Sequence, residues 1–252
     1  MPGADVFPGG RVDGGDREVA NDGWCDGIAG AGHLDDAHPE DAVAYHVAAV
    51  RETFEEAGIL LARDRHAQFV RLDEAELHVR FMRHRRDVHA GARSLREVME
   101  AEGLRVALDA LVPFAQWVTP PIDVRRFDTR FFIARMPPGQ TPAHDDTETT
   151  HGVWVTPADA LARCRRGDTS LPPPTWTTLR ELEGFGKVDE VFEWARGRRI
   201  VRCEPQFVES GDRKWLVLPG DPLSSEPPRE PPSPETRFEL VEGRWLARST
   251  ST

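Results

Sequence analysis

Apolar positions between residues 39 and 61 follow the period of an α-helix and predict an amphipathic helix that ends near Ala57. Pro39 suits the first turn of a helix, and apolar side chains then recur at helical spacing. At 100° per residue, one side of this helix collects Val43, Val47, Val50, Phe54 and Leu61. Glu52, Glu55 and Glu56 fall within about a 100° arc on the opposite side. We therefore expect the apolar side to pack inward and the other side to carry three carboxylates.

Shorter segments alternate between helical and strand patterns. Further helices are predicted over residues 73–90, 157–166, 175–184 and 188–197. Ser94 and Glu97 have the capping-box spacing that opens another helix. Strand patterns cover residues 131–134, 152–155, 200–202 and 215–218. The chain is thus predicted to contain both helices and strands.

Two segments have the composition of irregular structure. Residues 17–38 are rich in Gly and Asp and are predicted to form an irregular loop. Residues 221–235 are rich in proline and are predicted to be a linker without a core of its own. A short hairpin around Glu242 and Gly243 is expected to follow this linker.

Composition narrows the class of protein. The chain has 252 residues, enough for one good-sized core or for a core with a helical elaboration. Its formal net charge of −11 argues against a nucleic-acid partner, because binding a phosphate backbone relies on clustered Lys and Arg. Cys25, Cys164 and Cys203 lie far apart and fit free thiols in a reducing cytosol. No apolar run approaches about 18 residues, so we expect no membrane partner and a cytoplasmic location.

The three carboxylates of the predicted helix point to a divalent cation. Like charges this close on a helix repel each other, and a bound cation would relieve the crowding. Their oxygen ligands suit Mg²⁺ or Mn²⁺. A solvated acidic surface is the alternative interpretation of these residues. The basic run from Arg80 to Arg86 likewise has two interpretations, a solvated helix face or a phosphate-binding surface.

The segments around these carboxylates resemble the two halves of a Nudix box, whose usual pattern is G-x5-E-x7-R-E-U-x-E-E-x-G-U. The first half is Phe7-Pro8-Gly9-Gly10 with Asp16, and the second half runs from Arg51 to Ile59. Asp16 stands where the pattern has Glu, and Thr53 stands where an aliphatic residue is common. Gly10 and Arg51 are 41 positions apart instead of 14, which is an insertion of 27.

An interrupted box of this kind resembles the acyl-coenzyme A diphosphatase subgroup of the Nudix hydrolase superfamily, including bacterial members. The resemblance extends over roughly residues 5–221 through weaker segments, at 117–120, 126–132, 154–161, 171–175 and 218–221. It implies an α+β fold, an α/β/α sandwich with a mixed β-sheet and an inserted helical cap. The implied Nudix domain covers residues 1–221, and 222–252 form the linker and C-terminal tail. Within that domain the box spans 10–59, with an insertion at 17–43, and the helical cap spans 68–111. Because Met1 lies close before Phe7, the resemblance also predicts an internal methionine and a missing N-terminal part.

The resemblance further implies an enzyme that hydrolyses a diphosphate linkage with Mg²⁺ or Mn²⁺. The expected metal ligands are Glu52, Glu55 and Glu56, and Glu52 is the first candidate for general base or ligand. Arg51 is expected to orient a box carboxylate, and Glu55 to act beside it. Glu148 is the best alternative base, in a loop that also holds Asp145 and Asp146. The turn at Gly9 and Gly10 would allow close backbone approach and could add a main-chain ligand.

The preferred substrate implied by the resemblance is coenzyme A or acyl-CoA, giving 3′,5′-ADP and an (acyl-)phosphopantetheine. A small-molecule nucleoside diphosphate such as ADP-ribose or NADH is the alternative substrate. A non-catalytic nucleotide-binding Nudix module that regulates a partner is the alternative of another class. An inactive truncated chain is a third alternative. The oligomeric state does not follow from the sequence.

Overall fold

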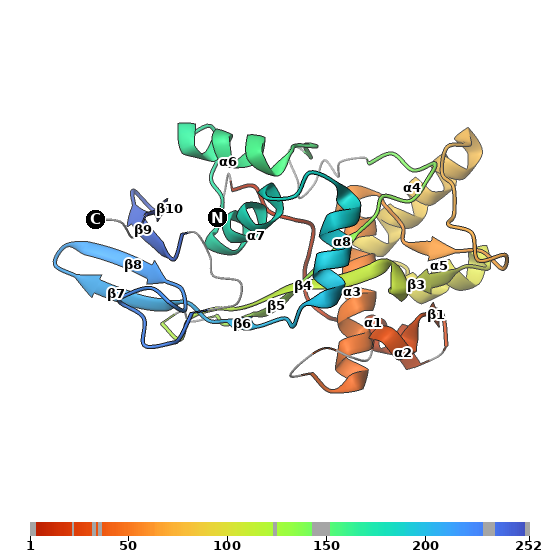
Figure 1. Ribbon diagram of the computed structural model, residues 1–252. Helices are drawn as coiled ribbons and strands as arrows, with labels where there is room; N and C mark the ends of the chain where they lie inside the picture. The colour runs from red at the N-terminus through yellow and green to blue at the C-terminus, as the bar shows by residue number, and fades with distance from the viewer. Residues whose placement is uncertain are drawn as a thin grey trace. The chain divides into compact units, whose positions relative to one another are not determined.

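The computed structural model describes residues 4–21, 23–31, 34, 37–122, 125–142, 152–228 and 235–249. The chain divides into two compact units. One comprises residues 8–112 and 132–153, and the other comprises 1–7, 113–131 and 154–252. The helices and strands of both are drawn in Figure 1. The elements are α-helices and mixed sheets, so the predicted α+β class is confirmed.

Helix α3 (Pro39–Ala57) is the centre of the first unit and has the predicted bounds. Its apolar side is buried in a core with Phe81 of α4 (Ala75–His89) and Met99 of α5 (Leu95–Glu102). Helix α5 begins with the predicted capping box, since Ser94 accepts a hydrogen bond from Glu97 N–H and Glu97 accepts one from Ser94 N–H. The helical period and the local capping residues were therefore sufficient to predict α3 and the start of α5.

Helix α3 ends at a backbone conformation that glycine adopts more easily than other residues. Gly58 has φ 69°, in the left-handed region, and its N–H donates to Phe54 O at 3.0 Å. The next N–H, of Ile59, donates to Thr53 O at 3.4 Å. The bond from Gly58 to the carbonyl four residues earlier is the left-handed (αL) helix end that glycine favours. The two bonds fix the point at which the chain leaves the helix, directly after Glu55 and Glu56.

The described residues within 17–38 contain more regular secondary structure than the predicted loop. It contains most of α1 (Gly14–Asn21), as well as β1 (Cys25–Asp26) and α2 (Ile28–Ala31). Helix α1 packs on α3 and on α5, and Val19 is fully buried. Strand β1 pairs with β3 (Arg105–Ala107), about 80 residues further along the chain. The prediction of an irregular loop was wrong because these partners lie far away in sequence.

A small mixed sheet completes the first unit. Its order is β1-β3-β2, where β2 is Ala62–Arg63. Strand β3 runs parallel to β1 and antiparallel to β2. The 3₁₀ helix η1 (Leu108–Ala110) follows β3 and contacts α2 and α3.

A second three-stranded sheet has the order β5-β4-β6. Strand β4 is Leu111–Val118, β5 is Asp128–Ala134 and β6 is Arg202–Cys203. Strands β4 and β6 are parallel, with Gln116 beside Arg202 and Trp117 beside Cys203. The predicted strands at 131–134 and 200–202 thus correspond to β5 and, in part, to β6.

The other unit contains three helices close to their predicted bounds. They are α6 (Pro157–Arg166), α7 (Pro173–Glu183) and α8 (Val188–Gly197). Four antiparallel strands form its sheet, in the order β10-β9-β8-β7. These strands are β7 (Gln206–Ser210), β8 (Arg213–Val217), β9 (Arg237–Val241) and β10 (Arg244–Arg248). The hairpin predicted around Glu242 and Gly243 is β9-β10, and it extends the sheet through pairing of β9 with β8.

One predicted strand is wrong. Among the described residues of 152–156 no strand forms, and Val153, Trp154 and Val155 are 55%, 73% and 36% exposed. Their apolar, β-branched and aromatic side chains favour a strand, but a strand also needs a neighbour to pair with. This neighbour could not be inferred from local composition.

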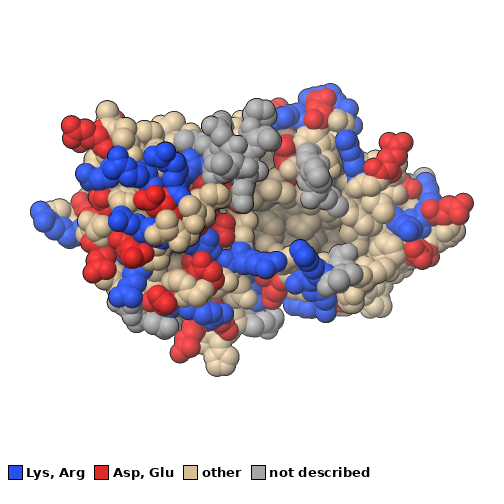
Figure 2. Space-filling model, turned by 180° about the vertical axis from the view of Figure 1, so that it is seen from behind, with Lys and Arg blue, Asp and Glu red and all other residues tan. Residues whose placement is uncertain are grey.

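The surface view agrees with the mixed composition of the chain. On the face shown in Figure 2, acidic and basic side chains are interspersed. Within the described part of the chain, no helix is both long and apolar enough to cross a membrane.

Candidate active site

The start of helix α1 brings an acidic side chain to the side of α3 that carries the carboxylates. Asp13 and Asp16 cap the start of α1 reciprocally: Asp13 Oδ1 accepts from Asp16 N–H, and Asp16 Oδ2 accepts from Asp13 N–H, both at 2.9 Å. This is a capping box built from two aspartates. It orients the Asp16 carboxylate, which is 1% exposed, toward α3.

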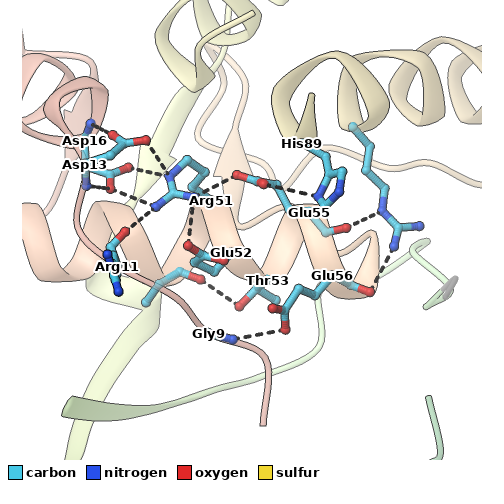
Figure 3. A network of polar contacts seen from close by, with 12 residues as sticks. Gly9, Arg11, Asp13, Asp16, Arg51, Glu52, Thr53, Glu55, Glu56 and His89 are labelled. Carbon is cyan, nitrogen blue, oxygen red and sulfur yellow. Dashed lines mark hydrogen bonds and ion pairs between the residues drawn. The ribbon is translucent and has the colours of Figure 1, made fainter. Parts of the chain in front are cut away.

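Arg51 lies at the centre of the site (Figure 3). Its Nε and Nη2 donate to the two oxygens of Asp16, at 2.9 and 3.0 Å. Nη1 donates to Glu52 Oε1 at 2.9 Å and to Glu55 Oε1 at 2.8 Å. Nη2 also donates to the carbonyl of Arg11 at 2.7 Å. One buried guanidinium thus joins three carboxylates and the loop before α1.

The charges at this centre do not balance. The single cation of Arg51 faces three hydrogen-bonded carboxylates, and Asp13 Oδ2 adds a fourth at 3.7 Å. The arrangement is therefore net negative in a poorly solvated place. A further cation would be attracted there.

Burial shifts the pKa of two of these acids. Desolvation raises the pKa of Glu52 above its usual value, although the charge of Arg51 acts against that change. Desolvation also raises the pKa of Asp16, again against its hydrogen bonds from Arg51 and Asp13. Burial alone would lower the pKa of Arg51, but Asp16 and Glu55 outweigh it and the pKa is raised. The guanidinium therefore stays charged at any working pH.

Glu56 points to the turn at Gly9 and Gly10. Its Oε2 accepts a hydrogen bond from the N–H of Gly9 at 3.1 Å (Figure 3). This bond joins the two halves of the box through Gly9 and Glu56, which are 47 positions apart in the chain. The loop and the end of α3 are held together by a carboxylate and a main-chain donor.

Gly10 lies against the side chain of Glu52. A Cβ atom at position 10 would be 2.1 Å from Glu52 Oε1 and 2.5 Å from its Cδ. Real Cβ contacts are never this short, so any larger residue would force Glu52 to move. The glycine is required here by the close approach of the loop to a carboxylate.

We expect Gly10→Ala to lower kcat clearly and to change the melting temperature little. The group that would clash is the carboxylate at the flexible end of the Glu52 side chain. It can rotate away and leave the fold intact, but it would lose its position beside Arg51. We expect a fall in kcat of at least about tenfold, as for other groups that orient a metal site. Steady-state kinetics and thermal melting of the variant measure both effects.

Gly14→Ala is the matched control for this substitution. Gly14 is the first residue of α1, and nothing lies within 4 Å of a Cβ built there. Equal kinetics for Gly10→Ala and Gly14→Ala would show that the contact with Glu52 has no bearing on the rate.

The three predicted metal ligands lie along one helix, yet their side chains point apart. Within the described residues, no three His, Cys, Asp or Glu side chains converge on a point that could hold an ion. The reason is visible in the contacts: Glu52 and Glu55 turn to Arg51, whereas Glu56 turns to Gly9. The oxygen donors and the net negative charge fit Mg²⁺ or Mn²⁺. A shared cation would need these side chains to rotate, and their role as ligands stays a prediction.

The alternative base lies in a part of the chain that is not described. Asp145, Asp146 and Glu148 all fall within 143–151, outside the described residues. The role of Glu148 as a base therefore stays a prediction from the sequence.

Two residues of α4 contact the site without having been predicted to do so. Arg85 is buried and donates to the carbonyls of Glu55 and Glu56, and His89 Nδ1 lies 3.6 Å from Glu55 Oε2. The sequence did contain a signal for this. Arg85 is four positions after Phe81, on the inward side of the predicted helix, where an unpaired arginine would be unfavourable. The interpretation of Arg80 to Arg86 as a purely solvated face was therefore incomplete.

Comparison with known proteins identifies similar sequences over most of the chain. The family model described as the NUDT19 Nudix domain matches residues 28–182. The acyl-coenzyme A diphosphatase NUDT19 of Homo sapiens is 30% identical over 273 residues, covering 90% of this chain and 69% of that protein. The corresponding protein of Xenopus laevis is 27% identical over 265 residues, with the same coverage.

A solved structure is similar in fold as well. The crystal structure of a Nudix hydrolase from Alicyclobacillus acidocaldarius has a TM-score of 0.62 and 29% sequence identity. The match covers 80% of this chain and 83% of that one.

Proposed function

The chain belongs to the Nudix hydrolase family, in the group of the NUDT19 Nudix domain, and from this premise we propose that it hydrolyses the diphosphate linkage of coenzyme A or acyl-CoA. The products would be 3′,5′-ADP and phosphopantetheine or its acylated form. The similarity to proteins named acyl-coenzyme A diphosphatase over 90% of this chain supports the substrate class. The chemistry of the reaction is supported by the site.

The observation that carries the proposal is the group of carboxylates on one side of α3. Glu52, Glu55 and Glu56 come from little more than one helical turn, and Arg51 neutralises only part of their charge. A regulatory module that only binds a nucleotide has no need of this concentration of acids. We therefore favour an enzyme over a non-catalytic binding module.

We propose that Glu52, Glu55 and Glu56 would hold Mg²⁺ or Mn²⁺. Such a cation would neutralise charge on the diphosphate and lower the pKa of bound water. Arg51 would orient Glu52 and Glu55, because its Nη1 donates to both. The Gly9–Gly10 turn lets the main chain approach the carboxylates closely, so a backbone oxygen there could add a ligand.

Glu52 is our candidate for the proton acceptor. Burial raises the pKa of its carboxylate, and a base whose pKa is closer to the working pH accepts a proton more effectively. Glu148 is the alternative base, from a later loop. Glu148→Gln is the deciding variant, because Glu52 is also a proposed metal ligand and its loss would lower turnover in either case. Near-normal turnover with an unchanged pH–rate profile in Glu148→Gln would exclude Glu148 as the base.

Product analysis by mass spectrometry tests the proposal directly. The chain is incubated with Mg²⁺ or Mn²⁺ and a mixture of CoA, acetyl-CoA, ADP-ribose and NADH in competition. We expect 3′,5′-ADP to appear from the CoA species first. A parallel incubation with the cation chelated should give no product.

Other outcomes would change the proposal in defined ways. Cleavage of ADP-ribose or NADH alone would keep a Nudix diphosphatase and exclude the CoA substrate. Absence of cleavage, combined with thermal stabilisation by Mn²⁺ and nucleotide, would support a binding module, because a ligand that binds the folded state raises its stability.

A further inference from the structure

The last turn of α3 carries Glu55 and Glu56, and its backbone carbonyls need partners. An α-helix leaves its last carbonyls without intrahelical donors. Those of Thr53 and Phe54 accept from Ile59 N–H and Gly58 N–H. The carbonyls of the two glutamates accept instead from a side chain of another helix, α4. Arg85 Nε donates to Glu55 O at 2.8 Å, and Arg85 Nη2 donates to Glu56 O at 2.9 Å.

Arg85 is built into the fold at this point. It is 6% exposed, so its guanidinium does not reach a substrate in solution. Its planar fork spans two successive carbonyls, which a single-point donor such as Lys does not reproduce. Its positive charge also lies at the end of α3 where the helix dipole is negative. These contacts hold the backbone from which Glu55 and Glu56 extend.

His89 lies one turn after Arg85 on α4 and faces the same place. Its Nδ1 is 3.6 Å from Glu55 Oε2, while Glu55 Oε1 accepts from Arg51 Nη1 at 2.8 Å (Figure 3). The carboxylate of Glu55 is therefore bounded on both sides, by α3 itself and by α4. Glu55 is 8% exposed, which restricts its alternative orientations further.

We propose that Arg85, assisted by His89, is a positioning residue for the carboxylates of this site. Arg85 fixes the backbone of the last turn of α3, and His89 limits the orientation of Glu55. Arg85 thereby fixes the backbone positions from which the side chains of Glu55 and Glu56 would turn to share a divalent cation. This inference rests on the proposed function, because it concerns the same glutamates.

The test compares substitutions of two arginines on one helix. Arg85→Met removes the donors and keeps an unbranched apolar stem, and Arg85→Lys keeps a charged donor group at a single point. Arg86→Met is the matched control, because Arg86 is the exposed neighbour on α4. For each protein, Mn²⁺ affinity is measured by isothermal titration, kcat and KM with CoA by steady-state kinetics, and Tm without Mn²⁺ by calorimetry.

We expect Arg85→Met to weaken Mn²⁺ binding and lower kcat by about 10- to 100-fold, as is usual for partners that orient metal ligands. KM should change little, because Arg85 does not touch the substrate. Arg85→Lys should recover part of the loss, and Arg86→Met should behave as the original protein. His89→Ala should weaken Mn²⁺ binding in the same direction and less.

A lower Tm with unchanged Mn²⁺ affinity and kcat would overturn the inference, since Arg85 would then be a stabilising residue only. An equal loss in Arg86→Met would overturn it too, because the effect would be one of overall charge. Mn²⁺ binding without hydrolysis by the original protein would contradict the proposed function alone, and the affinities would still decide the role of Arg85. Absence of Mn²⁺ binding by the original protein would overturn both.

Discussion

Glu56→Gln is expected to reduce kcat by more than about 100-fold while leaving Tm nearly unchanged. Groups that merely orient metal ligands usually contribute 10- to 100-fold, so a ligand itself should contribute more. The fold should tolerate the change because the amide oxygen of Gln can still accept the hydrogen bond from Gly9 N–H. What is lost is the negative charge that would hold the cation. Steady-state kinetics with CoA and Mn²⁺, together with calorimetry, measure the two effects.

Glu100→Gln is the control for charge. Glu100 is exposed on α5, so its substitution removes one negative charge elsewhere in the same unit. Its kcat should stay within twofold of the original. Near-normal turnover by Glu56→Gln would remove Glu56 from the site and leave the remaining two glutamates to account for any activity.

Arg51→Met is expected to have the largest effect on stability. The substitution leaves Asp16, which is 1% exposed, without its bidentate partner. Removing one member of a buried ion pair typically lowers the free energy of unfolding by about 3–5 kcal/mol. Activity should be lost as well, because Glu52 and Glu55 lose their common donor. Urea unfolding at about pH 7 measures the change in stability.

The loss in Arg51→Met should shrink as the pH falls. Burial already raises the pKa of Asp16, and without Arg51 two influences that lower it disappear, so the pKa rises further. The folded state of the variant then holds its proton to higher pH than the unfolded chain does. Its stability therefore increases on acidification from the folded pKa toward the unfolded value near 3.9. A loss that is the same at about pH 5 and pH 7 would contradict this account.

Further variants complete this experiment. Arg17→Met breaks the pair with Asp41, whose side chains are 53% and 43% exposed, and should change stability by at most about 1 kcal/mol. Adding Asp16→Asn to Arg51→Met should recover part of the loss, since the uncompensated buried charge is gone. With Asp16→Asn measured alone as well, the double variant's change minus the sum of the two single changes gives the interaction energy of the pair.

Helix α3, which carries Glu52, Glu55 and Glu56, could be predicted from the sequence. Its period, its proline start and its glycine end lie within about 20 consecutive residues, and α3 has the predicted bounds. The capping box at Ser94 and the turn of the β9-β10 hairpin are equally local, and both are present. The box pattern around Arg51 gave the family, which the comparisons confirm. These features depend on near neighbours in the chain, so propensity and spacing are sufficient to predict them.

The tertiary structure decided how the site is assembled. It packed helix α1, which runs from the first half of the box into the insertion, against α3 so that Asp16 is buried beside Arg51, and it left residues 152–156 without a strand. It also turned Arg85 inward, onto the carbonyls of Glu55 and Glu56. Each of these depends on a partner about 30 or more residues away, or on the lack of one. The sequence alone therefore determined which side of which helix carries the acids and that Arg51 lies among them, whereas only long-range packing brought Asp16, Gly9 and Arg85 to that helix.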